Sequence, residues 1–336
     1  MDIMRHRQHF YPAVARVPGG ADYPVAVDET FPPLPPATDI TVGVVDTGIV
    51  LDEAREPHRW FSGHVRFDAD DEDRLQVGTH DKSGPGYLAD ADGHGTFVSG
   101  LILREAPTAR IDMRGALDKA PQHDDFLGSD DDEAVAAAVR ALSLDPDVQV
   151  INLSFGGGVF AEEPKGLGRV LAGLDDRIAV VAAAGNDAKK NTPVWPAAFD
   201  GVISVGALDE RRARPPDGAP PRAPFSNYGS WVDAYAGGVQ LLGPFVYFDE
   251  ANEDEKADED EKVDEDNDYL YGPRPPQRFR GWARWSGTSF AAAVVSGRIA
   301  QTAAERDITG AQAAWALLDE SRRLFHDGAA WIRRSS

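Results

Sequence analysis

The chain of 336 residues contains no cysteine, so it can form no disulfide and offers neither a thiol nucleophile nor a thiolate metal ligand. It also lacks any apolar run close to the roughly 20 residues that a membrane-spanning helix requires. Its first twenty residues hold three arginines and two histidines, without the apolar core of a signal peptide. We therefore expect a cytoplasmic protein, or a secreted one if the sequence begins after its natural N-terminus.

Basic residues are also few, with 34 Lys and Arg against 56 Asp and Glu and a net charge of −22. This balance argues against a nucleic-acid partner. Half of this excess negative charge lies at residues 249–268, which hold thirteen acidic residues and two lysines. The segment has no hydrophobic periodicity, so we expect a disordered insertion. It would be a solvated loop without a specific role, or it would attract a basic substrate or partner by long-range electrostatics.

Apolar residues make up 42% of the chain, which is enough for a large core. Runs of β-branched and small apolar residues alternate with helical patterns. This alternation predicts an α/β fold with three α/β/α layers around a mostly parallel central sheet. The expected strands are 40–45, 109–115, 148–153, 178–184 and 202–206, and the expected helices are 97–103, 134–142, 169–174, 291–299 and 311–324.

The sequence predicts an arm, one large domain and a tail. Residues 1–38 end in a proline-rich stretch, which favours an extended arm that serves as a tether or as a ligand for an SH3-type domain. Residues 39–325 would form the domain, and residues 326–336 a C-terminal tail. Within the domain, residues 239–248 and 279–285 are expected to pair as a hairpin around the acidic insertion.

Three polar residues lie at the ends of expected elements, each beside glycine. Asp46 ends the first strand, His94 begins a helix that Asp92 would cap, and Ser289 begins an apolar helix. Each alone is more simply a capping or surface residue. Together they form a chemical set, because serine needs a base near neutral pH, histidine supplies one, and a carboxylate orients the imidazole ring. Asn186 ends another strand and would donate to an oxyanion with the backbone N–H of Ser289.

These motifs, with Asn152-Leu153-Ser154-Phe155-Gly156 and Ala183-Ala184-Gly185-Asn186, resemble those of the subtilisin-like serine peptidases. The order Asp, His, Ser along the chain is the subtilisin order as well. The resemblance implies a subtilisin-like fold in which Ser289 attacks the scissile carbonyl. His94 would act as base and then acid, Asp46 would orient His94, and Asn186 would complete the oxyanion hole.

The resemblance also implies a substrate cleft. Ser154, Phe155 and Gly156 would line it and pair with an extended peptide. The opposite wall of the primary specificity pocket would be formed by Ala183, Ala184 and Gly185.

Three positions depart from the family pattern. Phe290 replaces the common methionine after the nucleophile, Ala293 replaces a proline, and Val294 replaces a histidine. They concern the packing of the helix rather than proton transfer, so we still expect activity.

We expect no required cofactor and no bound metal. The helix after His94 runs into Ala106-Pro107, without the insertion that binds calcium tightly in many relatives. Residues 68–73 hold several carboxylates, but they lack the glycine and the distal glutamate of an EF-hand loop. We therefore expect a solvated acidic loop there; calcium binding is the alternative, and the sequence does not indicate it.

The first hypothesis is an intracellular serine endopeptidase of restricted specificity, with peptides or proteins as substrates. One alternative is a binding protein that has the subtilisin fold but has lost hydrolysis. Another is acyl transfer by the same site, as in peptide ligation or cyclisation. The presence of Asp46, His94, Asn186 and Ser289 favours the active enzyme, and nothing in the sequence shows the shielding from water that acyl transfer requires.

Overall fold

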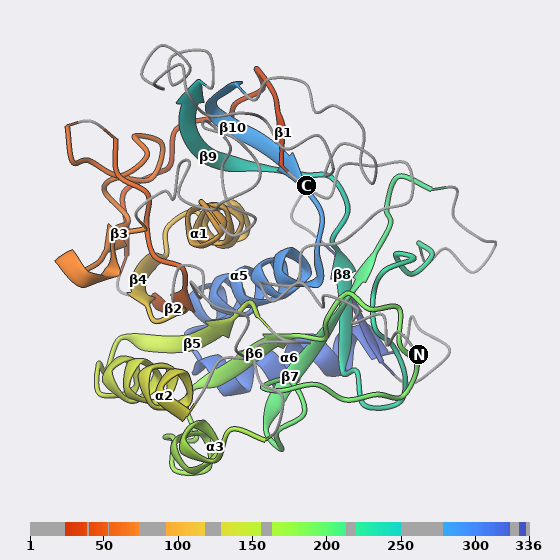
Figure 1. Ribbon diagram of the computed structural model, residues 1–336. Helices are drawn as coiled ribbons and strands as arrows, with labels where there is room; N and C mark the ends of the chain where they lie inside the picture. Colours follow the sequence, from red (N-terminus) through yellow and green to blue (C-terminus); the bar gives the residue numbers. More distant parts are fainter. Residues whose placement is uncertain are drawn as a thin grey trace, which may run out of the picture.

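The computed structural model describes residues 24–38, 40–52, 54–73, 92–117, 129–155, 163–212, 220–249, 278–322 and 329–333 (Figure 1). Gly156 and residues 250–268 of the acidic insertion lie outside these ranges, so the expectations about them stay predictions. Within the described ranges, no helix has the length and apolar character needed to cross a membrane.

A sheet of eight parallel strands forms the centre of the fold, in the order β11-β8-β7-β6-β5-β2-β4-β3 (Figure 1). All residues of β2 and β6 are buried, which explains why central strands appear in the sequence as continuous apolar runs. The strands are β2 (Thr41–Asp46), β3 (Val65–Arg66), β4 (Arg110–Gly115), β5 (Val148–Leu153), β6 (Ala179–Ala183), β7 (Val202–Leu208), β8 (Ala234–Gly237) and β11 (Ala330–Ile332).

Helices cover both faces of this sheet. One hydrophobic cluster joins the sheet to α1 (His94–Glu105), α5 (Thr288–Arg306) and α6 (Gly310–Arg322). A second cluster joins the opposite face to α2 (Ser129–Ser143) and α3 (Lys165–Leu171). The predicted three-layer α/β/α fold is therefore confirmed.

A small antiparallel sheet lies over α1, in the order β1-β10-β9 (Figure 1). The predicted hairpin forms it, with β9 (Leu241–Asp249) paired to β10 (Arg278–Trp285). The contact with α1 is close, because a Cβ placed on Gly100 would lie only 2.0 Å from Cγ of Pro244. The third strand, β1 (Val25–Ala26), was not predicted and comes from the N-terminal arm.

The described part of the arm is extended and is packed against the domain. The ring of Phe31 lies 5.3 Å from Trp60 and 5.2 Å from Trp282. Trp60 donates its Nε1–H to the carbonyl oxygen of Pro32 at 2.7 Å. The arm thus contacts β10, the strand that leads directly into the Ser289 helix.

Three local predictions need correction. The region predicted as a tail contains β11, which forms the edge of the central sheet beside β8. Asp92 does not cap α1. The N-cap is Gly93, whose φ of 73° suits glycine, and no side chain caps the helix there. The acidic loop is not wholly solvated, because Asp71 and Asp73 are buried.

Candidate active site

Asp46 and His94 meet at the carboxyl edge of the central sheet. Asp46 is the last residue of β2 and His94 the first residue of α1. Nδ1 of His94 lies 2.7 Å from Oδ1 of Asp46, and both side chains are fully buried. The same oxygen accepts the N–H of Thr47 at 2.8 Å. Because Nδ1 faces a carboxylate, it carries the proton, and Nε2 of neutral His94 is left as the acceptor.

Ser289 lies at the start of α5, and the residue that follows it contacts the His94 ring. The ring of Phe290, the next residue, is 5.3 Å from the imidazole ring. Ser289 Oγ and His94 Nε2 are both buried, and neither has a hydrogen-bond partner within the described ranges. A buried hydroxyl or ring nitrogen normally has a partner, so each of these two atoms calls for an explanation, and a reactive role is one such explanation.

Asn186 follows β6 at the same edge and is oriented by α5. Its Oδ1 accepts the N–H of Thr288 at 3.0 Å and the Oγ1–H of Thr288 at 2.9 Å. Thr288 Oγ1 in turn accepts the N–H of Gly185 at 3.1 Å. Nδ2 of Asn186 has no partner among the described residues. An amide held by its oxygen presents its N–H groups to whatever occupies the site.

The side chain of Ser154 holds the backbone of Ser289. Ser154 Oγ donates to the carbonyl oxygen of Ser289 at 2.8 Å and accepts from Asn152 Nδ2 at 2.8 Å. Asn152 Oδ1 accepts the Oγ–H of Ser296 at 2.9 Å. No role was predicted for Asn152, which is named above only as part of a family motif, or for Ser296. Their signal was a polar residue within an apolar strand or helix, which needs a buried partner.

The other residues expected in the cleft lie at strand ends. Phe155 follows β5 and is fully buried. Ala183 ends β6, and Ala184 and Gly185 follow it, with both alanines buried. Their contacts with a peptide stay predictions.

Aromatic rings pack behind His94. Phe290 is fully buried, with its ring 4.8 Å from Phe97 and 5.1 Å from Trp285. The rings of Trp285 and His94 are nearly perpendicular, with 5.7 Å between their centroids. The departure at Phe290 is thus accommodated by an aromatic cluster that packs against the imidazole ring.

In the part of the chain that the structure describes, no group of three or more His, Cys, Asp or Glu side chains is arranged to hold a metal ion.

Residues 37–328 match the model of the subtilase family. The chain belongs to this family. Over 220 residues it is 29% identical to subtilisin DY from Bacillus licheniformis, an alignment that covers 62% of this chain and 67% of that protein. Over 201 residues it is 30% identical to the thermophilic serine proteinase of Bacillus sp. strain AK1, covering 60% of this chain and 44% of that protein.

The chain thus spans about two thirds of the length of subtilisin DY, at 67%, and less than half of the thermophilic serine proteinase, at 44%. Among solved structures, a lanthipeptide protease superimposes with a TM-score of 0.56 and 19% sequence identity, covering 87% of this chain and 85% of that one. This likeness shows that the two proteins share a fold.

Proposed function

We propose that this subtilase is a serine endopeptidase that uses Asp46, His94 and Ser289 as its catalytic triad. The observation that carries the proposal is the 2.7 Å hydrogen bond between Asp46 and His94, beside a buried serine whose Oγ has no partner in the described ranges. An imidazole held in this tautomer is ready to accept a proton at Nε2.

Acylation starts when Ser289 Oγ attacks the carbonyl carbon of the scissile peptide bond and its proton passes to His94 Nε2. Asp46 stabilises the imidazolium that forms. The proton then moves from Nε2 to the leaving amine, which departs and leaves an ester on Ser289. Water attacks this ester with His94 again as base, so the second half-reaction regenerates the serine.

The negative oxygen of each tetrahedral intermediate needs donors that are in place beforehand. Asn186 supplies its Nδ2–H, because Thr288 engages the oxygen of the amide. The N–H of Ser289 lies in the first turn of α5, where backbone N–H groups have no partner within the helix and the helix dipole favours negative charge.

The proposal is tested with a fluorophosphonate probe, which forms a covalent bond with an activated serine. We expect the wild type to be labelled and Ser289→Ala to remain unlabelled. Ser99→Ala is the matched control, since Ser99 is also a fully buried helix serine, and it should be labelled like the wild type. A folded wild type that resists the probe would favour a silent binding protein and overturn the proposal.

Product masses separate hydrolysis from acyl transfer. Hydrolysis of a peptide library gives fragments whose masses together exceed the substrate by one water. Ligation or cyclisation gives products without that added water, and this outcome would contradict the hydrolase. The same library, with Ser289→Ala as control, gives the side-chain preference of the pocket expected at residues 183–185.

A further inference from the structure

Asp73 joins the two chain segments that carry Asp46 and His94. It is 2% exposed. Its Oδ2 accepts the Oγ1–H of Thr47 at 2.8 Å and the N–H of Gly93 at 3.0 Å. Thr47 follows Asp46 in the chain, and Gly93 precedes His94. One carboxylate oxygen therefore fixes the segment after β2 relative to the first residue of α1.

Thr47 extends this link to the other side of His94. Its Oγ1, which donates to Asp73, accepts the N–H of Gly95 at 3.1 Å. Its own N–H donates to Asp46 Oδ1, the oxygen that also faces His94 Nδ1. The backbone N–H groups on both sides of His94 are thus satisfied through the Asp73–Thr47 pair. Helix N-termini leave such N–H groups without intrahelical partners and favour a nearby negative charge.

The segment that carries Asp73 is fixed to the residues after β2. The N–H of Ile49 donates to the carbonyl oxygen of Asp71 at 2.9 Å, and the N–H of Asp73 donates to that of Ile49 at 2.8 Å. Gly48 allows this approach, because its φ is +104° and a Cβ there would lie 2.3 Å from the Asp71 oxygen. The position of Asp73 is therefore determined by backbone bonds as well as by its side chain.

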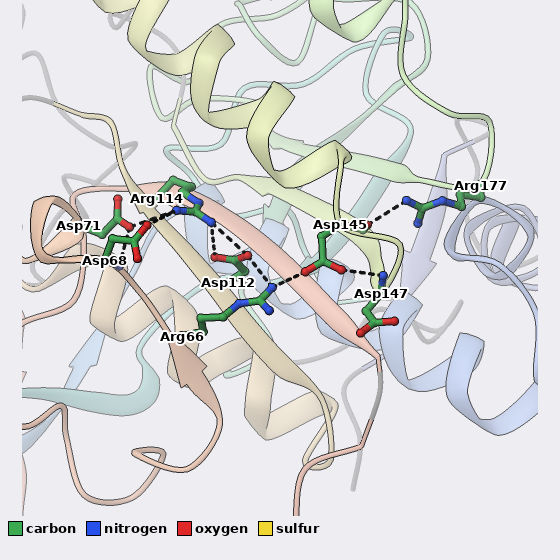
Figure 2. A network of polar contacts seen from close by, with 8 residues as sticks. All are labelled: Arg66, Asp68, Asp71, Asp112, Arg114, Asp145, Asp147 and Arg177. Carbon is green, nitrogen blue, oxygen red and sulfur yellow. Dashed lines mark hydrogen bonds and ion pairs between the residues drawn. The ribbon is translucent and has the colours of Figure 1, made fainter.

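Asp68 and Asp71, earlier in the same segment, bond to residues of β4 (Figure 2). Asp71 Oδ1 accepts the N–H of Gly115 at 2.8 Å. Arg114 reaches Asp68 Oδ2 at 3.0 Å and Asp112 Oδ1 at 3.1 Å, and Arg66 bonds to Asp112 Oδ2 at 2.7 Å. These contacts hold Asp68 and Asp71, which lie shortly before Asp73 in the chain, against β4.

We propose that Asp73 is a positioning residue of the triad, which holds Asp46 and His94 at hydrogen-bond distance by bonding Thr47 and Gly93. The inference rests on the proposed function, because it assigns a role within that site. The substrate is expected to bind at the ends of β5 and β6. Asp73 lies at neither of these strand ends. Its loss should therefore lower kcat while leaving KM nearly unchanged.

The test compares Asp73→Ala, Asp73→Asn and Asp70→Asn on a chromogenic peptide. Asp73→Ala should lower kcat on the order of 10²-fold, the cost of misplacing a catalytic group by about 1 Å. Asp73→Asn keeps an oxygen acceptor and should stay within about tenfold of the wild type. Asp70 is exposed in the same segment, so Asp70→Asn should leave both constants unchanged. A folded Asp73→Ala enzyme with wild-type kcat, or one whose loss lies in KM, would overturn the proposal.

A proton NMR signal gives a second readout that needs no turnover. The Nδ1 proton of His94, hydrogen-bonded to Asp46, should resonate far downfield in the wild type, in Asp73→Asn and in Asp70→Asn. It should broaden or disappear in Asp73→Ala. If that variant does not fold, Thr47→Val takes its place, since it removes the bridging hydroxyl and keeps the shape, and Thr47→Ser should restore the signal. An unchanged signal in Thr47→Val contradicts the proposal.

The two readouts also separate this inference from the proposed function. An inactive wild type would refute the peptidase, and the downfield proton would still report whether Asp73 sets the Asp46–His94 bond.

Discussion

Ser154 donates a hydrogen bond through its Oγ to the carbonyl oxygen of Ser289, 2.8 Å away. The two residues are 135 positions apart in the chain, so this bond joins the end of β5 to the start of α5. Ser154 in turn accepts from Asn152, which accepts from Ser296. The direction of every proton in this chain is determined, because the carbonyl oxygen can only accept. The backbone of Ser289, the proposed nucleophile, is thus anchored by a chain of buried side-chain hydrogen bonds.

We predict that Ser296→Ala lowers the free energy of unfolding by about 1–3 kcal/mol, because it leaves the buried Asn152 oxygen without its donor. Ser99→Ala is the control, since Ser99 is equally buried but its Oγ has no partner in the described ranges. That variant should change stability little. Urea unfolding of the two variants checks the prediction, and equal stability losses would count against the network.

We predict that Asn186→Leu lowers kcat far more than it raises KM, because the lost donor acts on the developing oxyanion. An oxyanion-hole asparagine in subtilisin accounts for about 10²–10³ in kcat, and we adopt that measured range for Asn186. Steady-state kinetics on a peptide substrate provides the measurement. A variant that loses substrate affinity and keeps kcat would place Asn186 in ground-state binding.

The free energy of unfolding should fall as the pH is lowered from 6.5 to about 4, because His58 has a different pKa in the folded and the unfolded protein. Burial, together with the positive charge of Arg59, lowers the pKa of His58 from 6.5 to about 4. Below pH 6.5 the unfolded chain takes up this proton and the folded protein does not, so folding is disfavoured increasingly down to about pH 4. The loss reaches about 3 kcal/mol.

His58→Phe tests this by removing the titrating group and keeping a ring beside Tyr247 and Trp282. Chemical unfolding between pH 7 and pH 4 should show a shallower decline for the variant than for the wild type. Parallel curves for the two proteins would show that His58 does not contribute to the decline.

Two arginines offer a matched test of ion pairing. Arg114 bonds the carboxylate of Asp112, which is 3% exposed, whereas Arg306 pairs with Glu320, and those two side chains are 45% and 57% exposed. Removing the partner of a buried charge costs about 3–5 kcal/mol, and an exposed pair is worth at most about 1 kcal/mol. Arg66 still contacts Asp112, so we expect Arg114→Met to lie at or below the lower end of that cost.

Thermal unfolding of Arg114→Met and Arg306→Met measures the difference. Arg114→Met should have the lower midpoint, and added salt should weaken the effect at Arg306 more, since exposed pairs are screened. Equal midpoints would mean that the network around Asp112 adds no stability.

The central strands and their polar ends could be predicted because each is a local pattern. β2 and β5 are buried runs long enough to be recognised, and Asp46 marks the end of one of them. β8 and β11 were missed, because strands of four and three residues have too little length to show a pattern. Their place in the sheet depends on neighbours far away in the chain.

Asp73 shows why a polar residue can be misread. In the sequence it ends an acidic run, and such runs are usually solvated. Its partners Thr47 and Gly93 lie 26 and 20 residues away, and only the fold brings them together. The cap of α1 was misassigned for a related reason, because Asp92 is the better capping residue by type but Gly93 has the φ that the chain requires there.

The position of β11 has a consequence for synthesis on the ribosome. The central sheet is completed by residues 330–332, which add to its edge beside β8. A nascent chain in which Asp46, His94 and Ser289 have already been synthesised still lacks this strand. The edge of β8 that pairs with β11 is then unpaired. The finished sheet therefore forms only after translation has passed this strand, later than the synthesis of Asp46, His94 and Ser289.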